Sequence, residues 1–405
     1  MSARRVAVTG LGAICALGRG VEATWAALSE GRSGIGPIAS VDGAGLRFSN
    51  GAEVRDFDPA RHLDSSRADL LDRFAQFALV AAREALSDSG VALTAELALR
   101  TAVFTGSCLG GQSTQDAGFV ELYRRGRERV HPLSIPRIMA NAGASQIAME
   151  LGVRGPCCTM STACSSANHA IGHAFWLVRS GVAELALAGG SEAPFSPGHL
   201  KAWEALRVIA PDTCRPFCRD RLGMILGEGG AMLVLEPLEA AQARGARVYA
   251  EISGFGMSAD AHHVTQPTVD GPVRAMRAAL SDAGLAPDQV GYVNAHGTGT
   301  RGNDSAEARA IREVFGPRRA SPAVSSTKSM HGHALGAAGA LEAVATVLAL
   351  HTGILPPTAN FTAPDPECDL DVVPNEARTA RVEAALSNSF AFGGLNAVLA
   401  FRSRG

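Results

Sequence analysis

The segment from Thr159 to Ser180 passes from small residues into a run of apolar residues at helical spacing. Ile171, Phe175 and Val178 recur every three or four positions, with Asn168 one turn earlier. Residue types that favour helix N-caps stand just before this run: Thr162, Ser165 and Ser166. The pattern predicts a helix that begins beside Cys164.

Other segments also show periodicities typical of strands or helices. We expect buried strands at four short apolar runs: Arg5–Gly12, Thr101–Thr105, Glu184–Gly190 and Gly230–Glu236. We expect helices at Glu22–Glu30, Ala68–Ser89 and Ile135–Leu151. Residues 33–56 are typical of a glycine-rich loop with brief strands, and residues 123–131 of a basic loop.

The chain repeats this pattern in its second half. Residues 8–12 match residues 252–256, and residues 84–90 match residues 278–284. A small-residue turn that leads into a long helix occurs at Cys164 and again at His333. Alternating strands and helices in a duplicated unit predict two mixed sheets covered by helices. Reactive groups are then expected on turns at strand ends, where the halves meet.

Composition limits the class of protein. The chain has 405 residues, 46% of them hydrophobic and 19% charged, and its 45 glycines are dispersed. A net charge of −2 and 5% aromatic residues argue against a nucleic-acid interface. The N-terminus shows no signal-peptide pattern, and no apolar run reaches about 18 residues, since Glu342 interrupts the best candidate at 337–350. We therefore expect a cytoplasmic protein without a membrane partner.

The eight cysteines form no CxxC pair, so scattered thiols in a reducing compartment are expected. Cys214, Cys218, His262 and His263 leave a zinc site as an alternative, although no metal is required. The GxG of residues 10–12 follows a predicted strand, but Cys15 stands at the third glycine position. The dinucleotide-binding fingerprint therefore fails.

Cys164 is the candidate nucleophile, because a helix start favours the thiolate form of a thiol. A buried, inert cysteine is the alternative. His296 begins a glycine-rich turn after the strand predicted at residues 291–295, and His333 lies in a second such turn; each could instead only cap its turn. Together with Lys328 they have the residue types of a nucleophile, a base and an electrostatic stabiliser.

These motifs identify a family. The chain closely resembles the β-ketoacyl-[acyl-carrier-protein] synthases, the elongating condensing enzymes of the thiolase superfamily, over essentially its whole length. The motifs are VTGLG at 8–12, TACSSA at 162–167, LGEGG at 226–230, HGTGT at 296–300, KSMHGHALGAAG at 328–339 and NSFAFGG at 388–394. The resemblance implies a thiolase-like α/β fold with two duplicated halves in five layers, α-β-α-β-α. The halves are expected at 1–247, with the nucleophilic cysteine, and 248–405, with the histidine pair.

The resemblance also implies a mechanism without a metal or an organic cofactor of the enzyme's own. Cys164 would take an acyl group from the phosphopantetheine arm of an acyl carrier protein, with the backbone N–H groups of Cys164 and Phe392 as oxyanion hole. His296 and His333 would assist loss of CO₂ from a malonyl thioester and stabilise the enolate that attacks the acyl group.

Supporting positions follow from the same resemblance. Lys328 would pair with Glu307, in the acidic run that starts at Asp304, and would orient His333. Phe392 matches a gate that swings to admit the malonyl carrier protein. Further substrate-binding positions are expected at Thr298 and Thr300 for the pantetheine arm, Gly393 beside the gate, Leu109 in the acyl tunnel and Met139 at its floor, near a dimer interface. Plain core packing is the alternative for the tunnel residues.

Several positions depart from the family pattern. Ala391 replaces the first glycine of the usual GFGG gate, and its Cβ is expected to stiffen the gate. Arg301, Leu395 and Cys218 also differ from the residues usual there. The string TACSSAN is similar to ketosynthases of secondary metabolism, including polyene-type systems, so a polyketide role stands beside a fatty-acid role.

The expected partners are an acidic acyl carrier protein and a second, homologous subunit in a homodimer or heterodimer. Candidate docking residues are basic: Arg67, Arg124, Arg125, Arg127, Arg129, Lys201 and Arg207. An ordinary solvated loop is the alternative for this cluster. Two other functions remain open: a priming or decarboxylase-only relative, and a chain-length-factor-like subunit without its own catalysis. Retention of Cys164 argues against a pure decarboxylase and against the non-catalytic subunit.

Overall fold

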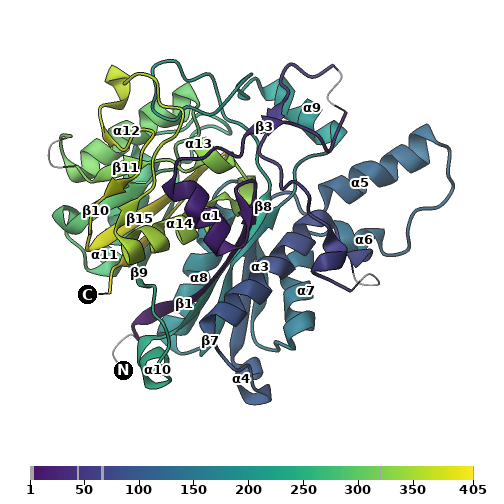
Figure 1. The fold of residues 1–405 in the computed structure, drawn as a ribbon, viewed down its shortest axis with the longest axis horizontal. Coiled ribbons are helices and arrows are strands. Elements are labelled where there is room, and N and C mark those ends of the chain that lie inside the picture. Colours follow the sequence, from purple (N-terminus) through teal and green to yellow (C-terminus); the bar gives the residue numbers. More distant parts are fainter. Residues whose placement is uncertain (1–3, 43–44, 65–67, 319–320, 405) are drawn as a thin grey trace.

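The computed structural model describes residues 4–42, 45–64, 68–318 and 321–404. Two halves, each a mixed set of strands with helices on its faces, lie side by side (Figure 1). The strands of the first half are β1 (Val6–Cys15), β2 (Gly18–Arg19), β3 (Gly36–Pro37), β4 (Asn50–Gly51), β5 (Thr101–Gly106), β6 (Cys157–Met160), β7 (Leu185–Glu192) and β8 (Gly229–Pro237). Those of the second are β9 (Ala250–Ala259), β10 (Val290–Asn294), β11 (Ala323–Ser325), β12 (Ile354–Leu355), β13 (Asp371–Val372), β14 (Arg378–Thr379), β15 (Ala384–Ala391) and β16 (Leu395–Arg402).

Helices separate these strands. The α-helices are α1 (Val21–Ser29), α3 (Arg73–Ser89), α4 (Ala95–Leu99), α5 (Gln112–Phe119), α6 (Ser134–Ile138), α7 (Ala142–Leu151), α8 (Ser166–Ser180), α9 (Pro197–Leu206), α10 (Leu238–Ala243), α11 (Asp270–Ala283), α12 (Arg301–Phe315), α13 (Lys328–His331) and α14 (Ala338–Thr352). Short 3₁₀ or π turns are η1 (Pro59–Arg61), η2 (Val120–Arg124), η3 (Pro287–Gln289), η4 (Leu335–Ala337) and η5 (Pro366–Cys368).

The two halves share one continuous sheet. Its order is β13-β11-β10-β15-β16-β9-β1-β8-β7-β5-β6, with β2 paired to β1. The two separate sheets expected from the repeat are therefore joined, because Val6–Val8 of β1 pair antiparallel with residues 250–252 of β9. The order is mirrored about this junction: β5 is parallel to β6 and β7 in one half, and β10 to β11 and β15 in the other.

The hydrophobic core confirms five layers. One cluster joins α8 and α14 to strands of both halves, through residues such as Ile171, Phe175 and Leu341. A second cluster packs α3 and α7 on the outer face of the first half, and a third packs α11 and α12 on the second. The order α-β-α-β-α follows. The division expected at residues 247 and 248 falls between α10 and β9 and stays a prediction.

The repeated glycines of β1 and β9 permit close contact with helices. A Cβ at Gly12 would meet the backbone of Ala81 in α3, and one at Gly256 the backbone of Ala275 in α11. Both helices end at a left-handed glycine, Gly90 and Gly284, in equivalent positions. The GxG pattern is therefore a packing device of the duplicated unit.

Two predicted helices have different limits. α3 begins at Arg73 because the Asp72 carboxylate accepts a hydrogen bond from the Phe74 N–H and caps the first turn. The helix expected at residues 135–151 is two helices, since Met139 between α6 and α7 is extended.

The apolar run at residues 335–352 has 18 residues, more than we expected from the sequence. Leu335–Thr352 has the length and composition of a membrane span, but 89% of it is buried within the described structure. Glu342 does not expose it, because its carboxylate is buried and ion-paired to Lys328. It is a core helix.

Candidate active site

Cys164 lies in a tight turn between β6 and α8. Ala163 adopts the left-handed region with φ 50°, which is costly for a residue with a Cβ. The turn is held by the Ser166 Oγ, which accepts from the Thr162 N–H at 2.9 Å, and by a 3.0 Å contact between Thr162 Oγ1 and His169 Nδ1. The turn leaves Cys164 buried, 7% exposed, at the inner end of a cavity.

Burial and the neighbouring groups shift the pKa of the Cys164 thiol in opposite directions. Burial raises its pKa to about 12 from an ordinary 9.0, while Lys328 and a hydrogen bond from the Phe392 backbone lower it less. A helix N-terminus contributes about 0.3–1 kcal/mol, which is under one pKa unit. Burial therefore opposes the effect of the helix start, and the expectation of a thiolate at Cys164 stays a prediction.

His296 and His333 meet in front of this turn, as the repeat predicted. His296 follows β10, and His333 follows α13. Their ring centroids are 5.4 Å apart with the planes at 84°. Burial, and then the charge of Lys328, hold the pKa of each imidazole well below its ordinary value, so both rings are neutral.

Hydrogen bonds select the tautomer of both rings. The Lys328 ammonium, which has no acceptor, lies 3.3 Å from His296 Nδ1. The Leu335 N–H donates to His333 Nδ1 at 3.2 Å. Because each Nδ1 accepts, each neutral ring carries its proton on Nε2. The site therefore holds two Nε2–H donors without a charged imidazolium.

Lys328 pairs with Glu342, not with Glu307. Its Nζ donates to Glu342 Oε1, and both side chains are completely buried. Glu342 lies on α14, directly after the turn that carries His333. The prediction of a Lys328–Glu307 pair is wrong because the Glu307 carboxylate binds backbone amides instead. Lys328 therefore contacts His296, whereas we expected it to orient His333.

Glu307 and Asp304 shape the turn that carries His296. Glu307 accepts from the N–H groups of His296 and Gly297, each at 2.8 Å. Asp304 accepts from the Gly299 N–H at 3.2 Å, and the Arg221 guanidinium lies 3.8 Å away. Both acids sit on α12 and are buried, so the turn is fixed to this helix.

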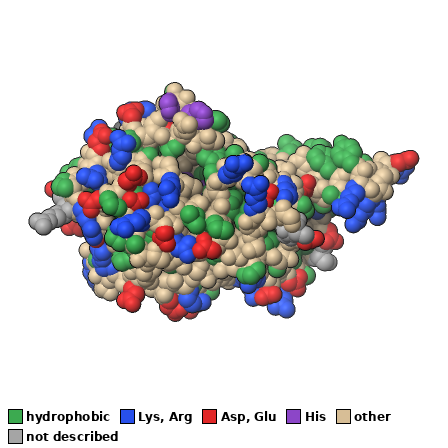
Figure 2. Space-filling view, turned by 90° about the horizontal axis from the view of Figure 1, so that it is seen from above, with side chains coloured by type: hydrophobic (Ala, Val, Ile, Leu, Met, Phe, Trp, Pro, Cys, Tyr) green, Lys and Arg blue, Asp and Glu red, His purple; other side chains and the backbone are tan. Residues whose placement is uncertain are grey.

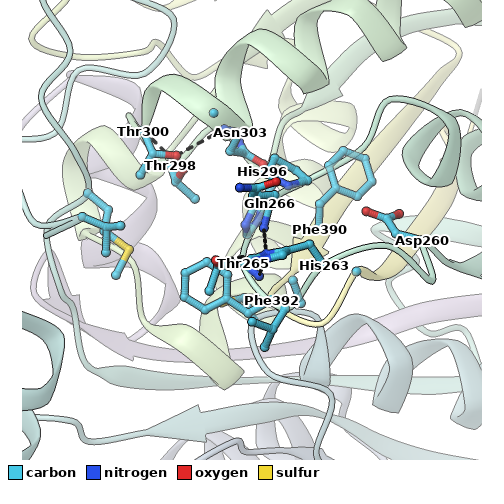
Figure 3. A pocket seen from close by; sticks show the side chains of 18 of the residues that line it. Asp260, His263, Thr265, Gln266, His296, Thr298, Thr300, Asn303, Phe390 and Phe392 are labelled. Carbon is cyan, nitrogen blue, oxygen red and sulfur yellow. Dashed lines mark hydrogen bonds between the residues drawn. The ribbon is translucent and has the colours of Figure 1, made fainter. Parts of the chain in front are cut away.

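A cavity of about 180 Å³ brings residues of both halves together. Cys164, His296 and His333 line it. Thr298 and Thr300 line it as well, and Figure 3 labels them together with His296. The two threonine hydroxyls are 2.9 Å apart. A lining that mixes hydroxyl and amide groups with aromatic side chains suits a polar arm that carries an apolar chain.

The segment that we expect to act as a gate follows β15. Phe392 lines the cavity together with Cys164, and its backbone N–H acts to lower the pKa of the Cys164 thiol. Ala391 ends β15 in an extended conformation paired with Leu395, so its Cβ is tolerated in this state. The left-handed positions are Gly393 and Gly394, at φ 81° and 68°. Gly393 is exposed, and its N–H donates to the Val264 carbonyl at 2.8 Å.

The structure leaves two predicted tunnel residues outside this lining. Leu109 packs in an apolar cluster with Phe392, and its N–H donates to Glu192 at 3.2 Å. Met139 is 48% exposed at the break between α6 and α7. Among the docking candidates, Arg67 lies outside the described residues, Arg125 and Arg127 pair with Glu121, and Lys201 pairs with Glu204.

Sequence reasoning missed part of the lining. Trp203 comes from α9. A loop after β9 contributes Asp260, His263, Thr265 and Gln266 (Figure 3). These residues stand in no repeated or spaced pattern, and only the fold brings them to the cavity. In the part of the chain that the structure describes, no group of three or more His, Cys, Asp or Glu side chains forms a metal site.

Comparison with known proteins agrees with this geometry. Residues 3–241 match the family described as "Beta-ketoacyl synthase, N-terminal domain", and residues 249–362 match "Beta-ketoacyl synthase, C-terminal domain". Nodulation protein E of a Rhizobium species is 50% identical over 399 residues, 98% of this chain and 99% of the relative. The 3-oxoacyl-[acyl-carrier-protein] synthase 2 of a Synechocystis species is 43% identical, over 98% of each chain. A solved structure described as "The ishigamide ketosynthase/chain length factor" is 40% identical, with a TM-score of 0.95 over 100% of both chains. The chain belongs to the β-ketoacyl synthase family.

Proposed function

We propose that this protein is a β-ketoacyl-acyl-carrier-protein synthase that uses Cys164 as nucleophile. The sulfur attacks the carbonyl carbon of an acyl thioester, the carbon–sulfur bond to pantetheine breaks, and the pantetheine thiol leaves with the proton. The observation that carries this proposal is that Cys164, His296 and His333, from opposite halves, line one cavity.

The second half-reaction joins two carbon chains. The bond between the malonyl α-carbon and its carboxylate breaks, CO₂ leaves, and the electron pair forms an enolate on the thioester. The α-carbon then attacks the acyl-Cys164 carbonyl and expels the sulfur. Two neutral Nε2–H donors, on His296 and His333, suit the developing oxyanion. The Phe392 and Cys164 amides fill the same role for the acyl carbonyl.

Thr298 and Thr300 are assigned to the pantetheine arm, because both line the cavity and their hydroxyls lie 2.9 Å apart. Leu109 stays assigned to the acyl chain and Met139 to the floor of its tunnel beside a second subunit. Gly393 supplies the hinge of the gate. Lys328 supports the reaction through His296, and Glu307 and Asp304 through the backbone of the His296 turn.

The proposed partners are an acyl carrier protein and a homologous subunit. The carrier is supported by the name of the Synechocystis relative, and the second subunit by the "ketosynthase/chain length factor" structure. β6 ends the sheet as an open edge, and exposed apolar side chains lie nearby on α6 and α7, notably Ile135 and Met149. We place the protein in the cytoplasm, where its eight free thiols persist.

The pathway is either fatty-acid or polyketide synthesis. Relatives of both kinds cover the chain, and the polyene-type reading rests on the TACSSAN string. A priming role and a chain-length-factor-like role are the alternatives.

Intact-mass analysis tests the proposal. Incubated with an acyl carrier protein, the wild type should gain the acyl mass, and Cys164→Ala should not. His296→Ala should still be acylated but should form no β-ketoacyl product when malonyl carrier protein is added. Cerulenin should add mass at Cys164. A wild type that takes neither acyl group nor cerulenin would favour the chain-length-factor-like role.

A further inference from the structure

Trp203 is an unexpected member of the cavity lining. It lies on α9, is 9% exposed, and belongs to an apolar cluster with Phe195, Leu200 and Met224. Its indole stacks on the ring of Phe392, with centroids 6.2 Å apart and planes at 24°. The gate therefore rests on a flat aromatic platform from the other half of the molecule.

The platform is itself fixed. The Trp203 Nε1–H donates to His199 Nε2 at 2.6 Å, one helical turn earlier on α9. Burial lowers the pKa of His199, with Asp116 acting in the opposite sense, so the imidazole is neutral and can accept. His199 thus sets the rotation of the indole.

α9 is anchored to a neighbouring helix. The Asp116 carboxylate, on α5, accepts from the Gly198 N–H in the first turn of α9 at 2.8 Å. α5 belongs to the segment that projects from the rest of the molecule in Figures 1 and 2. The indole therefore has a defined position relative to the rest of the first half.

Phe392 has two contacts that hold it over Cys164. It shares the cavity lining with Cys164, whose pKa its backbone N–H lowers, and its ring lies on Trp203. The two residues beyond it, Gly393 and Gly394, have left-handed backbone conformations that suit glycine, as expected of a hinge. Acylation changes the sulfur contact, whereas the aromatic contact depends on Trp203 and His199 alone.

We propose that Trp203, held by His199, is a positioning residue that keeps Phe392 closed over the cavity until Cys164 carries an acyl group. This rests on the proposed function. A gate that opens too early admits a malonyl thioester to a site without an acyl group. CO₂ then leaves, the enolate carbon takes a proton from water, and an acetyl thioester forms in place of a β-ketoacyl product.

The test measures the ratio of acetyl to β-ketoacyl carrier protein by mass spectrometry, with acyl and malonyl carrier proteins supplied together. Trp203→Leu removes the stack, and His199→Leu removes the acceptor while it leaves the indole. Each should raise the ratio by about two- to tenfold, the range an aromatic pair covers. His199→Gln retains an acceptor and should restore a ratio near that of the wild type.

Trp176→Leu is the matched control, because its indole donates to Asp282 and takes no part in the cavity lining. It should leave the ratio unchanged. Thermal unfolding checks that each variant is folded; if Trp203→Leu is not, His199→Leu decides.

Ratios equal to the wild type in His199→Leu and Trp203→Leu overturn the role of Trp203 while condensation by the wild type upholds the proposed function. A wild type that forms no β-ketoacyl product overturns both.

Discussion

At the scale of single residues, the site depends on buried charges and neutral rings. Lys328 and Glu342 are a fully buried pair, and Lys328 contacts His296. Burial raises the pKa of Glu342 to about 7, while Lys328 lowers it. A pair of this kind contributes less than its Coulomb energy, but loss of one partner leaves a charge in an apolar core.

Glu342→Gln should therefore destabilise the protein by about 3–5 kcal/mol. Condensation should fall more than acylation of Cys164, because His296 loses a fixed neighbour. Urea unfolding and intact-mass acylation measure the two effects. The exposed pair Arg274–Asp270 gives the control: Asp270→Asn should change neither. Equal stability of Glu342→Gln and wild type would contradict the role of the pair.

His331 gives a prediction of how the free energy of unfolding depends on pH, and this prediction does not involve catalysis. Burial, and then Lys328, lower its pKa to about 3 from 6.5. Below pH 6.5 the imidazole of His331 binds a proton in the unfolded chain but not in the folded chain. The contribution of His331 to the free energy of unfolding is therefore full above pH 6.5 and is lost as the pH falls towards 3.

His331→Gln removes this proton uptake. Between pH 7.5 and 5.5 the wild type should lose about 1.4 kcal/mol of unfolding free energy relative to the variant. Urea unfolding of both proteins at the two pH values measures the difference. Parallel pH dependence of the two proteins would show that His331 does not titrate as described.

At the scale of elements, each half depends on a helix pressed against a glycine-bearing strand. Gly256→Ala in β9 would push a Cβ into the backbone of α11 at Ala275 and Ala279. We expect a loss of about 1–3 kcal/mol, because neither backbone can withdraw. Thermal unfolding measures it.

Gly118→Ala is the matched control for this substitution. Gly118 lies in α5, and its Cβ would meet open space. It should keep or raise stability by up to about 1 kcal/mol, since alanine favours helix. If both alanine variants unfold alike, close packing is not the reason for the glycines.

At the scale of the whole molecule, the duplication and the turns that contain Cys164, His296 and His333 could be recognised in the sequence. Cys164, His296 and His333 could be predicted because each directly follows a strand or a small-residue turn in a repeated pattern. The partner of Lys328 could not, since Glu307 lies in an acidic run while Glu342 interrupts an apolar helix. Only the packing of α13 and α14 shows which carboxylate is near. Trp203 could not be predicted either, since only the fold brings α9 to the cavity.

The open edge of the sheet leads to the last prediction. β6 pairs with β5 on one side, and Cys157 and Cys158 on it are exposed. Ile135 and Met149, 64% and 61% exposed, lie on α6 and α7, and α7 packs beside β6. A second copy or a homologous subunit would cover this edge and these side chains together.

Ile135→Glu combined with Met149→Glu should thus convert a dimer to a monomer, because two carboxylates would be buried without partners. The fold should survive, since both side chains are exposed in the single chain. Light scattering during size-exclusion chromatography measures the mass, and circular dichroism the fold. Val182→Glu, at a residue 57% exposed elsewhere, should leave the dimer intact. A wild type that is monomeric alone, but dimeric after co-expression with a homologous subunit, would assign this face to a heterodimer; a double variant that still dimerises would place the interface elsewhere.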